Sequence, residues 1–328
     1  MNNPLVSVLM PIYNGAADLR KALDSVLSQT FGDFEVIAIN DGSKDDSAAL
    51  LNAVDDPRVR VIHQDNMGLA ATLNRGLSMA RGALIARQDQ DDLSHPERFA
   101  RQVSFLQSNP ECVLLGTAAE IWIGDERTDR AHDHPTEHAL LVFDLLFNNP
   151  FVHSSVMMRR DAVLALGGYT TDKDRQPPED YELWSRLARH GRVANLPERL
   201  VVYREVPQSM SRVGPNPFLD RLVTLSAENL GFSNGLDQPD SVMQDVAAVT
   251  HSAVHRLSRR PNIRAMTQAV NGAARRIAAD DPAVQARAAE RVRILQYQWM
   301  MRQTGAEWVR PILRKIRNLG RRLPLFRV

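Results

Sequence analysis

The first part of the chain alternates short apolar runs with segments of helical periodicity, and this alternation limits the possible folds more than any other feature. The apolar runs are residues 6–10, 34–39, 59–62 and 83–86, and the helical segments between them are residues 17–30, 47–54 and 67–79. Runs that are apolar throughout predict strands buried on both faces, as in a mostly parallel sheet flanked by helices. The predicted fold class is therefore α/β, in which ligands bind at the carboxyl ends of the strands.

Three carboxylates crowd the loop that follows the fourth predicted strand, namely Asp89, Asp91 and Asp92. Like charges packed together at a strand end are unfavourable unless a cation lies among them. Mg²⁺ and Mn²⁺ suit such a loop, because hard divalent ions take carboxylate oxygens and complete their shell with diphosphate oxygens. The loop alone leaves open the alternative of a solvated acidic turn.

Polar residues also follow the first and second predicted strands. Asp41 follows the second strand, so we expect it near the acidic loop, although an Asp-Gly turn is a common alternative. After the first strand come Tyr13, which can stack on a base, and Asn14, which can hydrogen-bond it. A plain strand-to-helix turn is the alternative there.

Helix-start patterns occur twice further along the chain. Ser94, Pro96 and Glu97 have the spacing of a capping box, which predicts that a fourth helix begins at Ser94. A helix is expected over residues 180–190, and the helix dipole by itself favours acidic residues such as Glu179 and Asp180 at its start. Residues 156–158, 193–196 and 200–203 are predicted as later strands, and the histidine-containing stretch 129–138 as an exposed loop.

A set of short motifs occurs in order along the first 205 or so residues: 11–14, 40–43, 66–69, 74–76, 89–92, 153–157, 167–169, 179–184 and 203–204. Each motif is loose alone, but their order and spacing resemble family 2 glycosyltransferases with the GT-A fold. The resemblance implies a metal-dependent, inverting transferase. Such an enzyme moves a sugar from a nucleoside-diphosphate donor, UDP by default, to a hydroxyl acceptor. Bacterial surface polysaccharide or glycan synthesis is the implied setting.

The resemblance also implies a role for each matched position. The nucleotide-binding positions are Pro11, Tyr13, Asn14, Asp41, Asn66, Arg75 and Asp89. The positions at the Mg²⁺ or Mn²⁺ ion are Asp91, Asp89 and Asp92. Asp180, with Glu179 beside it, matches the general base that takes the proton of the acceptor hydroxyl, while the metal ion stabilises charge on the leaving diphosphate.

The sequence departs from the family pattern at two places. Asn40 stands where the family often has a second aspartate, and residues 205–208 lack a histidine that many relatives carry there. Arg204 is then a candidate for the diphosphate, and His153 for the acceptor or a phosphate group.

Two other functions compete with sugar transfer. A nucleotidyltransferase that makes nucleotide-sugars needs a basic, glycine-rich loop after the first strand, and residues 11–15 do not provide one. A catalytically silent, membrane-associated scaffold would have no need of Asp91 and Asp180, although their presence does not decide the matter.

The composition changes near residue 207, which predicts a catalytic domain over residues 1–207 and a helical carboxyl-terminal region over 208–328. Apolar residues repeat at helical spacing through 308–323, with basic residues between them. A basic amphipathic helix can lie on an anionic membrane, close to lipid-linked acceptors. Packing of this stripe on the catalytic domain or on a second subunit is the alternative.

The overall composition limits which classes of partner and which cellular compartment we expect for this protein. The formal net charge of +1 gives no overall attraction to nucleic acid. The single cysteine, Cys112, cannot form an intramolecular disulfide and is interpreted as a buried small hydrophobe. The sequence shows neither a signal-peptide pattern nor an apolar run of about 18 residues. We therefore expect a cytoplasmic protein, with peripheral contact to the inner face of the cytoplasmic membrane through residues 308–323.

Overall fold

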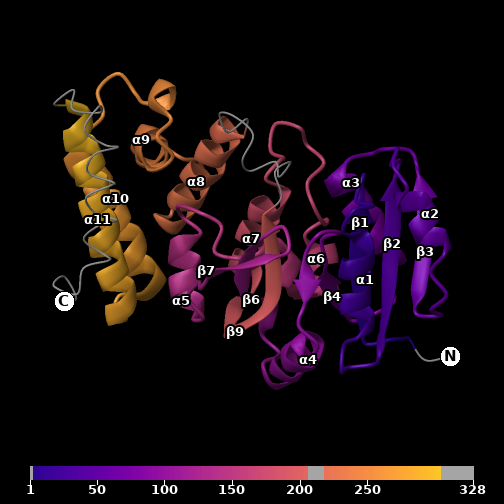
Figure 1. Cartoon of the computed structure of the whole chain (residues 1–328). Helices are drawn as coiled ribbons and strands as arrows, with labels where there is room; N and C mark the ends of the chain where they lie inside the picture. The colour runs from indigo at the N-terminus through magenta and orange to yellow at the C-terminus, as the bar shows by residue number, and fades with distance from the viewer. Residues whose placement is uncertain (1–2, 206–217, 304–328) are drawn as a thin grey trace. The chain divides into compact units, whose positions relative to one another are not determined.

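The computed structural model describes residues 3–205 and 218–303 (Figure 1). The chain divides into two compact units, residues 1–229 and 230–328. The first unit runs past the change of composition near residue 207 and includes most of helix α8 (Leu219–Ser233).

The parallel part of the sheet lies in the first unit, where the sequence predicts it. Its strands are β1 (Val6–Ile12), β2 (Phe34–Asp41), β3 (Val59–Gln64) and β4 (Leu84–Arg87). They lie in the order β3-β2-β1-β4, and every pairing among them is parallel. The helices between them are α1 (Leu19–Leu27), α2 (Ser47–Asn52) and α3 (Leu69–Met79). The carboxyl ends of β1, β2 and β4 therefore meet at one edge.

The sheet continues beyond β4 with mixed strand directions. The further strands are β5 (Leu93–Ser94), β6 (Cys112–Ile123), β7 (Glu126–His132), β8 (Met157–Arg159) and β9 (Arg192–Glu205). Strand β8 runs antiparallel to both β4 and β6, whereas β6 and β9 are parallel. Strand β9 is one long strand where two short ones were predicted, and β7 replaces part of the predicted loop at 129–138.

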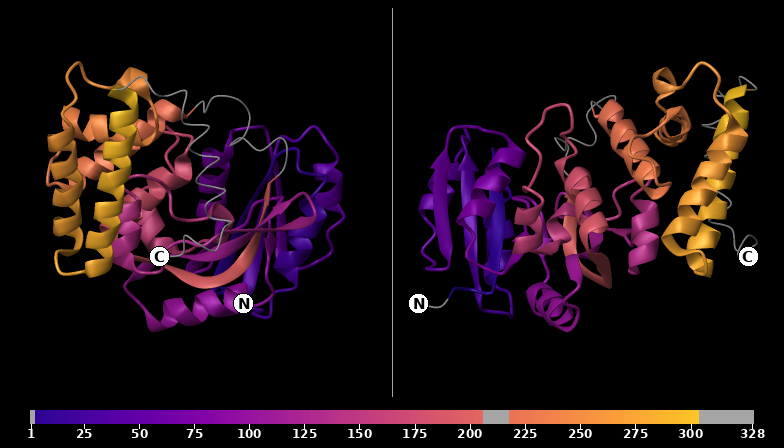
Figure 2. Two further views of the ribbon diagram at one scale, coloured as in Figure 1. Left: turned by 60° about the vertical axis from the view of Figure 1, so that its left-hand side comes forward. Right: turned by 180° about the vertical axis from the view of Figure 1, so that it is seen from behind.

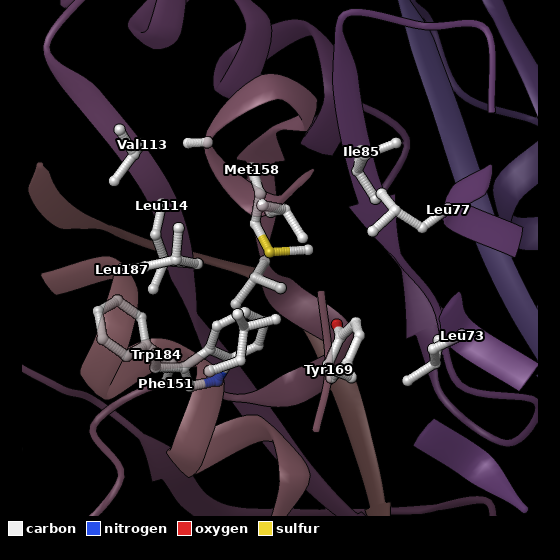
Figure 3. Packing of buried hydrophobic residues seen from close by; sticks show 14 of the residues in the cluster. Leu73, Leu77, Ile85, Val113, Leu114, Phe151, Met158, Tyr169, Trp184 and Leu187 are labelled. Carbon is white, nitrogen blue, oxygen red and sulfur yellow. The ribbon is translucent and has the colours of Figure 1, made fainter. Parts of the chain in front are cut away.

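Helices cover both faces of this sheet, because buried side chains alternate along its strands. Leu9 and Ile37 pack on one face with α3 and α7 (Glu179–His190), while Val8 and Val36 pack on the other with α1 and α4 (Arg98–Ser108). Figure 3 shows the first cluster, in which Trp184 and other side chains of α7 lie near β6 and β8. Cys112 is buried, as predicted.

The fourth helix begins three residues later than the capping-box pattern predicts, with Glu97 in place of Ser94 at its N-cap. Ser94 pairs with Val201 in the sheet, and its hydroxyl donates to Gln88 Oε1 at 2.7 Å. It also accepts a hydrogen bond of 2.8 Å from Arg98 Nη1. The capping-box prediction is wrong because Ser94 is used by tertiary hydrogen bonds instead of the helix end.

The remaining helices of the first unit are α5 (His138–Asp144), the short 3-10 helix η1 (His153–Ser155), α6 (Arg160–Ala165), α7 and α8. The second unit is helical through its described residues, as predicted. It contains α9 (Ser241–Thr250), η2 (Val254–Arg256), α10 (Ile263–Ala278) and α11 (Pro282–Gln303), with α10 and α11 side by side (Figures 1 and 2). Within the described ranges, none of the helices combines the length and apolar character needed to cross a membrane.

Candidate active site

The acidic loop at the end of β4 is organised by one serine from η1. Ser154 Oγ lies 2.6 Å from Asp89 Oδ2 and also contacts Asp92 Oδ2. The Asp89 amide donates to the same hydroxyl oxygen at 3.2 Å. Ser154 is fully buried, so this contact joins the two carboxylates away from water.

A buried arginine supplies positive charge to this loop. Arg87, the last residue of β4, forms an ion pair with Asp89 Oδ1, and its side chain is fully buried. Burial opposes ionisation of Asp89, but the charge of Arg87 and the Ser154 hydrogen bond hold its pKa below the usual range. Asp89 is therefore the ionised partner of Arg87.

The other two acids of the loop are more easily protonated. Burial, and then the charges of Asp89 and Asp91, raise the pKa of Asp92 well above its usual value. Because a serine hydroxyl has only one proton, Ser154 can donate to only one of the two carboxylates, Asp89 or Asp92, at a time. Burial and the charge of Asp89 raise the pKa of Asp91 to about 6.

Asp91 is the member of the loop best placed to bind a cation. In the part of the chain that the structure describes, its carboxylate has no hydrogen bond or ion pair to another side chain. No three His, Cys, Asp or Glu side chains among the described residues converge as a ligand set. A single free carboxylate still fits Mg²⁺ or Mn²⁺, because these ions commonly use one or two carboxylates plus phosphate oxygens.

Asp41 shapes the turn that leads into α3. Its carboxylate accepts hydrogen bonds from Gln64 Nε2 at 2.7 Å, from the Met67 amide at 2.8 Å and from the Gly68 amide at 3.0 Å. Asn66 Nδ2 donates to the Asp41 carbonyl at 3.1 Å. Gly68 has a φ of +85°, a conformation that side chains disfavour. The predicted nucleotide residues Asp41 and Asn66 thus form one structured turn.

Arg75 belongs to the same corner of the site. It projects from α3, and its Nη1 donates to Gln64 Oε1 at 2.6 Å. Because Gln64 also donates to Asp41, the three side chains form a chain of hydrogen bonds between β3 and α3.

The loop after β1 is joined directly to the acidic loop by Gln90. Its side-chain amide accepts from the Tyr13 amide at 2.8 Å and donates to the Tyr13 carbonyl at 3.1 Å. The Tyr13 ring remains 46% exposed, which leaves it open for stacking. Asn14 has a φ of 51°, and its Oδ1 accepts from the Lys44 amide at 2.8 Å. Pro11 lies within β1, opposite Ile39.

Asp180 lies in the first turn of α7 with both carboxylate oxygens engaged. Asn149 Nδ2 donates to its Oδ2 at 2.8 Å, and the Tyr181 amide donates to its Oδ1 at 2.7 Å. Its neighbour Glu179 is buried, and burial together with the charge of Asp180 raises the pKa of Glu179 to about 7. The negative charge of Asp180 thus favours the protonated form of Glu179.

The acidic loop and α7 belong to one site. Both Asp89 and Asp180 raise the pKa of His153, although burial and the charge of Arg87 lower it overall. Arg87 and Asp89 also influence Glu179 electrostatically. Asp89 from the loop after β4 and Asp180 from α7, far apart in the sequence, thus both act electrostatically on His153.

Comparisons with known proteins decide the family. The model for glycosyl transferase family 2 matches residues 7–167. The putative glycosyltransferase EpsE of Bacillus subtilis is 35% identical over 219 residues, which are 64% of this chain and 77% of that protein. This chain belongs to glycosyltransferase family 2.

Two more relatives agree with this assignment. The amylovoran biosynthesis glycosyltransferase AmsE of Erwinia amylovora is 35% identical over 61% of this chain and 76% of that protein. An uncharacterized glycosyltransferase of Haemophilus influenzae is 33% identical over 62% of this chain, and the match spans 66% of that protein's length. The family assignment removes the nucleotidyltransferase alternative.

Solved structures show that the fold is GT-A. Residues 1–349 of Staphylococcus aureus TarS, in complex with UDP-GlcNAc, match with a TM-score of 0.61 over 92% of each chain at 16% identity. The mannosyltransferase PcManGT of Pyrobaculum calidifontis, in complex with GDP-Man and Mn²⁺, matches with a TM-score of 0.51 over 92% of this chain and 87% of that one at 17% identity.

Two sequence-predicted residues of this glycosyltransferase have partners of their own. His153 Nε2 accepts a hydrogen bond of 3.3 Å from Arg87, and the lowered pKa of His153 makes it a neutral imidazole. The Arg204 guanidinium is only 3% exposed and binds Asp18 and Asp125. Its backbone amide donates to Asp92 Oδ1 at 2.9 Å. Arg204 therefore braces the acidic loop, and its guanidinium is already occupied.

Sequence reasoning missed four residues that build this glycosyltransferase site, namely Gln90, Arg98, Asn149 and Ser154. Ser154 and Gln90 lie inside matched motifs, so a search for hydrogen-bonding residues within the motifs would have found them. The fully buried Arg98 donates to the carbonyls of Arg87 and Val156, and no local pattern marks it. Asn149 precedes a proline in a loop and is equally unmarked.

Proposed function

We propose that this enzyme transfers a sugar from a nucleoside-diphosphate donor, with UDP as the first candidate, to a hydroxyl acceptor with inversion at the anomeric carbon. The observation that carries the proposal is the pairing of two different carboxylates at one site. Asp91 presents a carboxylate free of side-chain partners at a strand end, whereas Asp180 is oriented by hydrogen bonds on α7.

On the donor side, we assign Asp91 as the principal ligand of Mg²⁺ or Mn²⁺. Asp89 and Asp92 would then act mainly by holding the loop in place. Asp89 is already bound by Ser154 and Arg87, and Asp92 by Ser154 and the Arg204 amide. A bound divalent ion would supply positive charge to the leaving diphosphate. That PcManGT was solved with GDP-Man and Mn²⁺ supports this assignment by analogy.

On the acceptor side, we assign Asp180 as the general base. The acceptor oxygen forms a bond to the anomeric carbon while its proton passes to the Asp180 carboxylate. The bond from that carbon to the diphosphate oxygen breaks, and the electron pair leaves with the diphosphate. The single displacement inverts the anomeric centre and needs no covalent nucleophile. Asn149 and the Tyr181 amide fix the direction from which Asp180 receives the proton.

The nucleoside would bind between the loop after β1 and the turn before α3. The exposed Tyr13 ring offers a surface for stacking, and Asn14, Asn66 and Arg75 offer polar groups. Asp41 would contact the nucleobase from the turn before α3, which its hydrogen bonds hold in shape. UDP is chosen first because TarS, which shares the fold, was solved with UDP-GlcNAc.

We place the reaction in cell-surface polysaccharide or glycan synthesis, in line with the name of AmsE. Residues 308–323 lie outside the described residues. From their sequence, which carries six basic residues, we propose peripheral contact with the cytoplasmic face of the membrane, near lipid-linked or glycan acceptors.

Calorimetric titration with UDP, with and without Mn²⁺, tests the donor site. Wild type should bind UDP in a metal-dependent way, and Asp91→Ala should abolish the metal dependence. Asp24→Ala is the control, because this exposed acid lies on α1 and pairs with the exposed Arg20. If UDP fails, dTDP and GDP follow. Failure of all three with metal would overturn the donor site and favour the silent scaffold.

A further inference from the structure

Helix α8 joins the two segments that hold Asp180. The base receives its hydrogen bond from Asn149, which follows α5, while Asp180 itself belongs to α7. Asn229 Nδ2 on α8 donates to the Leu145 carbonyl at 2.8 Å and to Ser185 Oγ at 2.9 Å. One side chain thus bridges the end of α5 and the body of α7.

Two further hydrogen bonds strengthen this bridge. Ser226, one turn before Asn229 on α8, donates from its hydroxyl to the Leu146 carbonyl at 2.6 Å. The Tyr181 hydroxyl donates to the Leu145 carbonyl at 2.7 Å. We call Ser226 and Asn229, with these contacts, the α8 clamp.

The clamp contacts both segments that position the proposed general base, Asp180. Leu145 and Leu146 lie only a few residues before Asn149, and Tyr181 and Ser185 follow Asp180 within about a turn of α7. Asn229 Oδ1 also accepts a 2.6 Å hydrogen bond from Arg189, nearer the end of α7. A change in the clamp therefore alters the position of the Asn149 donor relative to the Asp180 acceptor.

The polar groups of the clamp are buried, which makes the arrangement specific. Ser226 and Asn229 are 0% and 5% exposed. Removing one partner of a buried hydrogen bond leaves the other unsatisfied, which costs about 1–3 kcal/mol in typical cases. If Asn229 is replaced, its partners Leu145, Ser185 and Arg189 lose their hydrogen bonds. The end of α5 and α7 would then have to shift to recover them.

We propose that Asn229, assisted by Ser226, is a positioning residue for sugar transfer that sets the geometry of the Asn149–Asp180 pair. The inference rests on the proposed role of Asp180 as the base. It extends the functional part of the chain into α8, beyond the residues that the family model matches.

The kinetic test uses full-length variants and a nucleotide-sugar that wild type turns over. Asn229→Ala should lower kcat by about tenfold or more, since misplacing a catalytic group by about 1 Å can cost 10²-fold. The donor KM should stay unchanged, because the donor residues lie on other elements. Ser226→Ala is the milder second variant, for use if Asn229→Ala does not fold.

A double-mutant cycle separates positioning from general destabilisation. Asn149→Ala removes the donor to Asp180, so the clamp then has no pair to position. The Asn149→Ala/Asn229→Ala double variant should be about as slow as Asn149→Ala alone. If the fold-losses in kcat of the two single variants instead multiply in the double variant, the proposal is overturned. Asp245→Ala is the control, because Asp245 is a buried hydrogen-bonding residue of the second unit, bound to Ser258.

Hydrogen exchange tests the clamp without any substrate. The Phe151 amide donates to Asn149 Oδ1 at 3.0 Å, and the Tyr181 amide donates to Asp180 Oδ1, so these amides report on the two side chains. Asn229→Ala should speed exchange at both, whereas Asp245→Ala should not. Unchanged exchange at both amides would refute the clamp. If wild type cleaves no nucleotide-sugar, the proposed function fails while the exchange result still decides on the clamp.

Discussion

The hydroxyl of Ser154 lies 2.6 Å from Oδ2 of Asp89 and joins this carboxylate to that of Asp92. We predict that Ser154→Ala weakens metal-dependent nucleotide binding by about tenfold, because the buried Asp92 and the partly exposed Asp89 lose the group that keeps them together. Titration calorimetry with UDP and Mn²⁺ measures the change.

Ser155→Ala is the control for this variant. Ser155 is equally buried in the same motif, but its hydroxyl donates to the Val152 carbonyl and accepts from the Thr117 amide, neither of which belongs to the acidic loop. Its replacement should leave nucleotide affinity within about twofold of wild type. Equal losses in the two variants would contradict a special role for Ser154.

The raised pKa of Glu179 predicts a pH-dependent stability. The pKa is about 7 in the folded protein against an ordinary value of 4.5, so the folded state binds the proton more tightly. The contribution of Glu179 to stability is therefore fully present below about pH 4.5 and is lost as the pH rises through 7. Glu179→Gln should remove this dependence and raise stability at pH 8 by about 2–3 kcal/mol. Thermal unfolding at pH 5.5 and pH 8 tests it, and an unchanged pH dependence would contradict it.

Arg98 is predicted to be a major source of stability. It is fully buried and hydrogen-bonds to carbonyls and to the side chains of Gln88, Ser94 and Gln102, and among the described residues none of its hydrogen bonds goes to a carboxylate. Arg98→Met should destabilise the first unit by about 3 kcal/mol or more, because several buried acceptors lose their donor.

Arg101→Ala provides the comparison on the same helix. Its exposed ion pair with Glu97 should contribute less than about 1 kcal/mol. Urea unfolding followed by the fluorescence of Trp184, which is buried in the first unit, compares the variants. A loss for Arg98→Met no larger than that for Arg101→Ala would refute the prediction.

Gly15 makes room for the link between the two ligand-binding loops. A Cβ atom at this position would lie 2.3 Å from Gln90 Oε1. Gly15→Ala should therefore displace Gln90 from Tyr13 and lower UDP affinity several-fold. The matched control is Gly32→Ala, where the added atom meets nothing within 4 Å. A Gln90→Ser change should relieve the clash, so the Gly15→Ala defect should become smaller in that background.

The parallel strands were predictable because their sequences are mostly apolar, as is typical of a sheet covered on both faces. Strand β7 was not, because most of its residues are exposed and polar, and β6 provides its hydrogen bonds. The Ser94 pattern was misleading because a capping-box spacing carries no information on the tertiary partners of that serine.

The positions of Asp41 and of the acidic loop were predictable for a related reason, since parallel strands bring their carboxyl ends to one edge, whereas the role of Asp180 on α7 came only from the family resemblance. The groups that support these acids were not. Arg98 and Asn229 act through buried contacts to distant segments, and such contacts leave no periodic pattern in the sequence. The histidine-containing stretch 129–138 was predicted as a loop, but it is partly regular structure. His132 ends β7 and stacks on His134, and His138 begins α5.

The most direct test of the central claim is sugar transfer by Asp180→Asn, compared with its binding of UDP and Mn²⁺. Asparagine retains the shape of the side chain but cannot take the acceptor proton. We predict a loss of at least about 10²-fold in kcat with nucleotide affinity unchanged. Transfer at the wild-type rate by Asp180→Asn would contradict the assignment of the base and the mechanism built on it.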